Sequence, residues 1–144
     1  MRYLFSLMAI VVTSLLLPHT AQAHLFAPSL LKLSELSPQS YNVVWKTPVK
    51  TISNIPLRPI WPEGCETQAE SAARTEGTGI VSSWQLVCDS SHDQGLVGQL
   101  LGVSGLGANQ VSAMVILNLR DGRHYQQVLT AETPQFRVPL EPVQ

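Results

Sequence analysis

Apolar and polar residues alternate along several stretches of this chain with the period of two that is typical of half-buried β-strands. Two such stretches follow each other early in the chain, and Tyr41, Val43 and Trp45 fall on one face of the second. A short polar segment that contains Pro38 separates the two stretches and forms a turn signal. The pattern therefore predicts a β-hairpin over residues 29–47.

The strongest strand is predicted at residues 111–119, VSAMVILNL, which are apolar enough for us to expect a strand that is covered on both faces. Asp121 and Gly122 follow it, and they predict a tight hairpin turn in which both residues adopt positive φ. The chain is then expected to return as a strand with Tyr125 and Val128 pointing inward.

Shorter strands are predicted at residues 80–88, 96–106 and 135–140, and the glycines of the second would let it bend or bulge. Residues 71–80 are small and polar and are typical of a loop. Residues 48–63 hold four prolines. Because proline lacks the N–H that a β-ladder needs, this segment is predicted to be an edge strand or an extended connection.

Short strands separated by turn signals predict an all-β fold, and we expect an antiparallel β-sandwich of about seven strands, Ig-like in the loose sense. No stretch after residue 23 combines a sustained period of 3.6 residues with helix caps. Residues 24–144 have a length that fits a single domain with a hydrophobic core of its own.

The first 23 residues have the organisation of a secretory signal peptide that forms a signal helix. Arg2 precedes an uncharged apolar run, Pro18 ends that run, and Ala21 and Ala23 occupy the small-residue positions of a cleavage site. The alternative is an uncleaved anchor, but the run is shorter than the roughly 20 residues that span a bilayer. The sequence therefore predicts export to the periplasm or the outer face of a membrane.

The charge of the remaining chain excludes some classes of partner. Cleavage removes Arg2 and leaves slightly more acidic than basic residues, without a basic stripe. This composition argues against a nucleic-acid partner and against electrostatic attachment to a membrane surface. No later apolar run is long enough to cross a membrane.

The chain has two cysteines, Cys65 and Cys88. In an exported protein such a pair favours a disulfide, and closing this loop would stabilise the fold by roughly 3 kcal/mol. The alternative is a metal-binding or redox pair of thiols. Because neither cysteine belongs to a C-x-x-C motif, the disulfide is the preferred interpretation.

Motifs of catalysis are missing from the sequence. It contains neither H-E-x-x-H nor a Walker loop. The glycine-rich stretch 102–107 fails as a nucleophile elbow at Leu106, and the overlapping dinucleotide pattern fails at Gln110. We therefore predict a protein that is not an enzyme, although carboxylates brought together in space would leave no such motif.

Aromatic and histidine side chains are the candidates for binding. Trp45 and Trp84 lie on apolar strand faces and are predicted to belong to the core, whereas Trp61 is expected to be partly exposed and is a candidate partner surface.

Three histidines follow the cleavage site. His24 would carry the free amine and an imidazole on one residue, and with His92 or His124 it would form a nitrogen site suited to Cu(II), with Ni(II) or Co(II) as other candidates. The alternative is that cleavage leaves His24 at a loose end and that the other two are ordinary surface residues.

A series of landmarks resembles the exported N-terminal domain of HupE/UreJ-type membrane proteins, here without the transmembrane part. The landmarks run in order over about residues 24–139: the Ala-His junction, Pro28 with the Leu-rich first strand, Trp45 with Pro48, PEGC at 62–65, Trp84 with Cys88, and FRVP at 136–139. Some members of that family are regarded as nickel or cobalt permeases, with the transport chemistry in membrane helices. The resemblance implies an export domain associated with metal handling.

Two hypotheses of function follow. The first is an exported, non-enzymatic accessory or interaction domain that works beside a membrane protein and contacts it through the proline-rich edge. The second is a periplasmic protein that binds copper, nickel or cobalt through His24.

Overall fold

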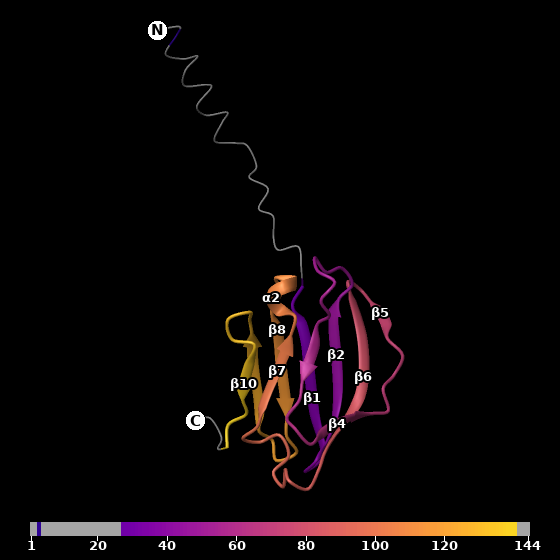
Figure 1. Ribbon diagram of the computed structural model, residues 1–144, viewed down its shortest axis with the longest axis vertical. Helices are drawn as coiled ribbons and strands as arrows, with labels where there is room; N and C mark the ends of the chain where they lie inside the picture. The colour runs from indigo at the N-terminus through magenta and orange to yellow at the C-terminus, as the bar shows by residue number, and fades with distance from the viewer. Residues whose placement is uncertain (1–2, 4–26, 141–144) are drawn as a thin grey trace.

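The computed structural model of the chain describes Tyr3 and residues 27–140 (Figure 1). The predicted cleavage site and His24 lie outside the described residues. Ten strands and one short helix follow from Ser29 onwards: β1 Ser29–Ser37, β2 Ser40–Pro48, β3 Arg58–Ile60, β4 Cys65–Gln68, β5 Arg74–Glu76, β6 Gly79–Cys88, β7 Leu100–Ser104, α2 Leu106–Asn109, β8 Ala113–Asn118, β9 His124–Leu129 and β10 Gln135–Arg137. No helix among the described residues is long and apolar enough to cross a bilayer.

Seven of the strands form one sheet in the order β4-β6-β2-β1-β8-β9, with β5 also paired to β6. The predicted hairpin over residues 29–47 is confirmed, because β1 and β2 are antiparallel and Leu31 lies opposite Trp45. The remaining three strands form a second sheet in the order β10-β7-β3.

The prediction of an antiparallel fold of about seven strands needs two corrections, because ten strands are present among the described residues and one pair of neighbours is parallel. β1 and β8 are parallel neighbours, with Ser29 opposite Ala113 and Ser34 opposite Asn118, so the larger sheet is mixed. A two-residue turn can join only antiparallel strands, whereas parallel neighbours need a long crossover connection. Here the whole chain from β2 to α2 lies between the two strands, and it passes through both sheets before it returns.

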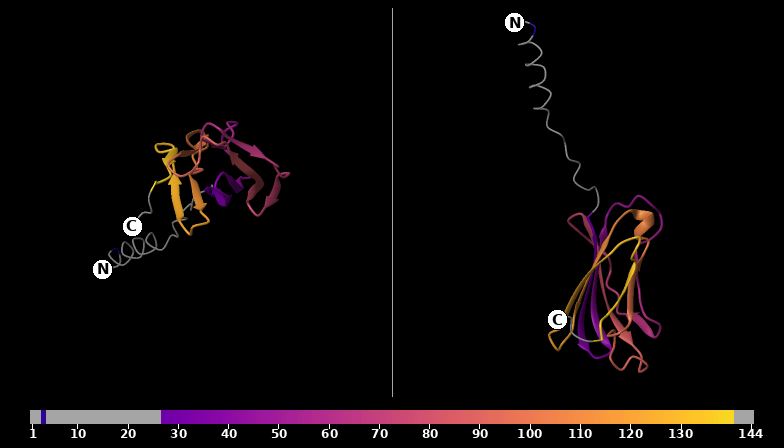
Figure 2. Two further views of the ribbon diagram at one scale, coloured as in Figure 1. Left: turned by 90° about the horizontal axis from the view of Figure 1, so that it is seen from below. Right: turned by 90° about the vertical axis from the view of Figure 1, so that its left-hand side faces the viewer.

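The two sheets pack face to face around one hydrophobic core, and the second view in Figure 2 shows them as two layers. Alternate residues of β1, β2 and β8 point inward and are fully buried, as the period of two predicts. Leu101 and Val103 of β7 close the core from the smaller sheet. The tyrosine of β2, Tyr41, is among the largest fully buried side chains.

Two strands, β4 and β5, were not expected from the sequence, and β5 falls within the predicted loop at 71–80. Both are short and mostly exposed at the edge of the sheet. Their polar residues carry no apolar alternation, so the period of two could not reveal them. The predicted strand at 96–106 is shorter than expected: residues 94–98 form turns, and β7 begins at Leu100.

The turn between β8 and β9 also differs in detail. Gly122 has φ 93°, whereas Asp121 is not among the residues with positive φ. The N–H of Gly122 donates to the carbonyl of Leu119 at 3.1 Å, and the N–H of Leu119 donates to the carbonyl of Arg123 at 2.9 Å. This is a three-residue loop with a glycine bulge rather than a two-residue turn.

Two predictions about side-chain direction near this turn need correction. Tyr125 is buried as predicted, but Val128 is exposed and the inward residue near the end of β9 is Leu129. The outward face of β8 is only partly covered, rather than covered like its inner face.

The sheets have two distinct ends, which we name by what lies there (Figure 1). At the α2 end, β1 begins, β2 ends and the helix α2 lies beside the segment after β2. At the disulfide end, Cys65 lies opposite Cys88, and the turns at 37–40, 89–99 and 119–123 gather.

Candidate functional site

The proline-rich segment 48–62 carries the largest concentration of exposed apolar side chains among the described residues. Val49, Ile52 and Ile55 are 47, 51 and 55% exposed, and Ile60 is also exposed. The other exposed large apolar residues are spread singly over different elements: Tyr3, Leu36, Leu100, Val128 and Leu140. Scattered surface apolar residues are ordinary, but a group of them marks an interaction surface.

The first part of this segment, loop 49–57, is firmly attached to the rest of the protein. Asn109 of α2 is fully buried, and its Nδ2 donates to the carbonyl of Ile55 at 2.8 Å and to that of Gly105 at 3.0 Å. Leu57 is buried in the core. The loop therefore holds its apolar side chains outward on a fixed backbone rather than hiding them.

Gly105 allows the chain before α2 to pass close to this loop. It has φ 85°, and a Cβ there would lie 2.5 Å from the carbonyl oxygen of Pro56. A side chain at this position would therefore be strained and would also push the loop away. Between the loop and Ile80 lies a shallow cleft of about 360 Å³, lined in part by Pro48, Val49 and Ile55.

The second part of the segment contains β3, one of the two edge strands of the three-stranded sheet, as predicted for a proline-bearing edge. Pro59 lies opposite Val103, but the N–H of Val103 points away from β3 and donates to the carbonyl oxygen of Pro134. The ladder to β7 therefore runs through Arg58 and Ile60, and Pro59 faces outward without an N–H to offer. This edge favours contacts through side chains over the addition of another strand.

Trp61 continues from this edge and is half-buried. Its ring meets that of Trp84 edge to face, with centroids 6.4 Å apart and planes at 78°. Trp84 and Trp45 are buried in the core, which confirms their predicted role. Trp61 packs against that core and so attaches the end of the segment to it, while Trp61 itself stays partly exposed.

The disulfide predicted between Cys65 and Cys88 is present, and it joins β4 to β6 within one sheet. The two residues lie directly opposite each other at the disulfide end. The bond fixes the start of β4, a strand that is otherwise exposed and polar, and so holds the far end of the proline-rich segment.

The two described histidines do not face a common point. The Nε2 of His92 is hydrogen-bonded to the carbonyl oxygen of Glu63, which ties the turn after β6 to the turn before β4. His124 begins β9 and shares a hydrogen bond of 2.7 Å between its Nδ1 and the Oδ1 of Asn118, on the outward face of the sheet. No three His, Cys, Asp or Glu side chains in the part of the chain that the structure describes are grouped for a metal ion.

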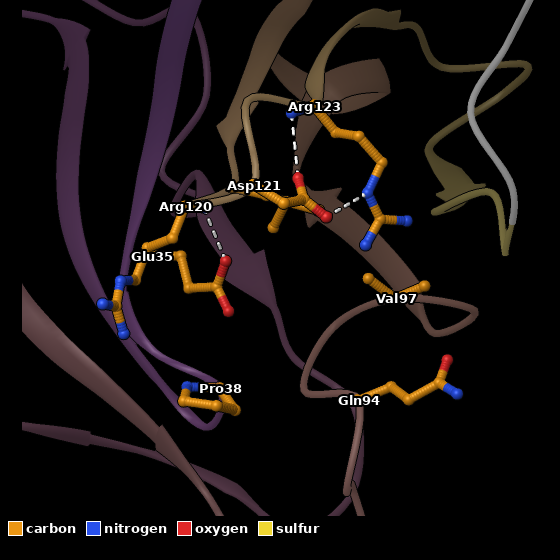
Figure 3. A pocket seen from close by; sticks show the side chains of 8 residues that line it. Glu35, Pro38, Gln94, Val97, Arg120, Asp121 and Arg123 are labelled. Carbon is orange, nitrogen blue, oxygen red and sulfur yellow. Dashed lines mark hydrogen bonds and ion pairs between the residues drawn. The ribbon is translucent and has the colours of Figure 1, made fainter.

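A charged cleft of about 310 Å³ lies at the disulfide end (Figure 3). Its wall includes the carboxylates of Glu35 and Asp121 and the side chains of Arg120 and Arg123. Glu35 accepts the backbone N–H of Arg120 at 2.8 Å. Asp121 accepts from the backbone N–H of Arg123 at 3.0 Å and forms an ion pair with its Nε at 2.7 Å.

These contacts engage the acidic groups of the cleft. The backbone and side-chain hydrogen bonds from Arg123 lower the pKa of Asp121, so it is ionised across the neutral range. Nearby, hydrogen bonds from the hydroxyl and N–H of Ser91 lower the pKa of Asp89. A general acid or base needs a pKa near the working pH, and both shifts move away from it. The contacts of Glu35 with Arg120 and of Asp121 with Arg123 therefore hold the turn at 119–123.

Comparison with known proteins found no matching family model, no matching curated protein and no matching solved structure. The resemblance to the exported domain of HupE/UreJ-type proteins therefore stays a prediction.

Trp61 and the prolines of this segment stand out in the sequence, whereas its exposed aliphatic residues do not. Val49, Ile52 and Ile55 recur every third residue between Pro48 and Pro56, a spacing that departs from the period of two that predicts the strands of this chain. That mismatch was the available signal. The role of Asn109 has no signal in the sequence, because its hydrogen-bond partner Ile55 is 54 residues away in the chain.

Proposed function

We propose that this chain is an exported, non-enzymatic accessory domain that binds a membrane protein through its proline-rich segment 48–62. The observation that carries the proposal is the group of exposed aliphatic side chains on loop 49–57, held outward by the hydrogen bond from Asn109 to Ile55. A fixed apolar surface of this kind loses little conformational freedom when a partner covers it.

Two further observations support export and association with a membrane. The Cys65–Cys88 disulfide is the kind of bond that persists in oxidising compartments. The apolar run before Pro18 has the features of a signal peptide. The ordered landmarks of the HupE/UreJ-type domain, which precedes a membrane part in that family, agree with a partner of the same kind.

Photo-crosslinking in the cells that make the protein tests this proposal. A photoreactive residue is placed at Ile55, and a matched one at Leu36, which is similarly exposed but lies at the disulfide end. We expect the variant at Ile55 to form an adduct with one integral membrane protein and the variant at Leu36 to form none. Equal adducts at both positions, or none at Ile55, would contradict the proposal.

A further inference from the structure

We infer that the tip of loop 49–57 docks on the surface of an anionic lipid bilayer. This inference rests on the proposed function, because it gives the accessory domain the orientation in which its proline-rich segment meets a membrane protein. Three independent observations carry it: the apolar tip, the separation of charge between the two ends, and the point at which the N-terminal segment joins the domain.

The apolar tip has the chemistry that an interfacial contact requires. Val49, Ile52 and Ile55 are each about half exposed, and loop 49–57 projects beyond the end of β2. Aliphatic side chains of a peripheral protein insert into the boundary between lipid headgroups and acyl chains, and the buried apolar area supplies much of the binding. Because Asn109 and Leu57 anchor the end of the loop, Val49 and Ile52 can enter the lipid together, while Ile55, whose carbonyl Asn109 holds, stays available to the protein partner.

Charge is distributed unevenly between the two ends. Residues 46–62 contain three basic residues, Lys46, Lys50 and Arg58, and no acidic one. Two acidic residues, Glu76 and Glu132, also lie at the α2 end. The Oε1 of Glu76 lies 3.9 Å from the Nζ of Lys46, and its Oε2 lies 3.5 Å from the Nη2 of Arg74. Around the disulfide end lie six acidic residues, Glu35, Glu63, Glu66, Asp89, Asp93 and Asp121, and three basic ones, Arg120, Arg123 and Arg137, so acidic groups outnumber basic ones there. Although the chain as a whole has a net negative charge, the α2 end is locally positive, and anionic lipid would attract it.

The polypeptide reaches the domain at this same end. β1 begins at Ser29, and the pairing of Leu30 with Lys46 places the first residues of β1 beside the end of β2, which loop 49–57 follows. The apolar run that ends before Pro18 is therefore joined to the α2 end by a short connection. A run held in the membrane would therefore keep this end of the domain close to the bilayer, and after cleavage the loop would keep it there.

Depth-dependent quenching of a single fluorescent label tests this inference. The protein is expressed from the full-length sequence and purified with the N-terminus that the cell leaves. Both native cysteines are bonded to each other, so a new thiol in the Ile52→Cys variant is the only one that reacts with the label. The Leu36→Cys variant is the matched control, because Leu36 is 48% exposed and lies at the disulfide end.

The two labelled proteins are mixed with vesicles that carry a quencher on the acyl chains. The vesicles are either pure phosphatidylcholine or phosphatidylcholine with roughly a quarter phosphatidylglycerol, an anionic lipid. We expect the label at position 52 to be quenched and blue-shifted, more strongly with the anionic lipid, and the label at position 36 to be unaffected. Adding Lys50→Gln to the Ile52→Cys variant should weaken the dependence on phosphatidylglycerol.

Each outcome decides between the two proposals. An unquenched label at position 52 in both kinds of vesicle, or equal quenching at positions 52 and 36, overturns the lipid inference. If the label is unquenched while Ile55 still crosslinks to a membrane protein, only the lipid inference falls. If the label at position 52 is quenched but Ile55 forms no crosslink, the lipid inference is supported and the proposed protein partner is excluded.

Discussion

The hydroxyl oxygen of Tyr41 accepts a hydrogen bond from the backbone N–H of Leu96 at 3.0 Å, across 55 residues of chain. Both residues are fully buried. The bond joins the centre of the larger sheet to the turns at 94–98, where Gln94 and Val97 line the charged cleft. A side chain of β2 thus anchors this loop, together with the hydrogen bonds that Gln39 donates to the carbonyl of His92 and that Arg137 donates to the carbonyl of Gly98.

The Tyr41→Phe substitution should lower the free energy of unfolding by about 1–3 kcal/mol, because it leaves the buried N–H of Leu96 without an acceptor. Denaturant unfolding at neutral pH measures the change. The control is Tyr125→Phe, which removes another buried phenol that accepts no backbone N–H. Equal effects of the two substitutions would contradict the role assigned to the bond.

The free energy of unfolding at alkaline pH should also depend on Tyr41. Burial raises the pKa of the Tyr41 phenol above its ordinary value near 10, although the hydrogen bond from Leu96 opposes this shift. The folded state therefore favours the neutral phenol, so its contribution is complete below pH 10 and is lost as the pH rises through the raised pKa. Denaturant unfolding from pH 9 to 12 should show a steeper decline for the wild-type protein than for Tyr41→Phe.

Gly95 should tolerate no side chain. It has φ 59°, and a Cβ there would collide with the carbonyl oxygen of Pro38 and the hydroxyl of Tyr41. Gly77 provides the matched control, because it has φ 60° and nothing within 4 Å of the same position. We expect Gly95→Ala to destabilise the protein by about 1–3 kcal/mol more than Gly77→Ala, the cost of overpacking alone. Thermal unfolding of the two variants measures this difference, and similar midpoints would refute it.

The disulfide should be complete and stabilising. Thiol labelling of the denatured, unreduced protein should detect no free cysteine, and two labelled thiols would show that the bond does not form. The double substitution Cys65→Ala and Cys88→Ala should lower the free energy of unfolding by about 3 kcal/mol. Chemical unfolding of the double variant against the wild-type protein measures the loss.

The features predicted correctly from the sequence depend on neighbouring residues. The hairpin at 29–47 and the burial of Trp45 and Trp84 follow from local alternation, and the pairing of Cys65 with Cys88 follows from there being only two cysteines. The features that were missed depend on partners far along the chain. Nothing in β1 itself specifies β8 as a parallel neighbour.

The exposed aliphatic residues of the candidate site were missed for a related reason, although its prolines and Trp61 were predicted. Exposure, rather than residue type, distinguishes Val49, Ile52 and Ile55 from core residues, and only the packed structure reveals it. The charge of the α2 end was hidden in the same way, because the net charge of a chain contains no information about which residues share a surface.

The metal site predicted at His24 stays a prediction, and the fold sharpens its test. His92 and His124 lie at the disulfide end, whereas β1 begins at the α2 end. The Nε2 of His92 is also engaged with Glu63. We therefore expect His92→Ala and His124→Ala to leave the affinity for Cu(II), Ni(II) and Co(II) unchanged in calorimetric titrations of the processed protein. One extra residue ahead of His24 should abolish binding, because it removes the free amine from the chelate. Loss of binding in His124→Ala would place the terminus at the disulfide end instead, and no binding to the processed protein would remove the metal hypothesis.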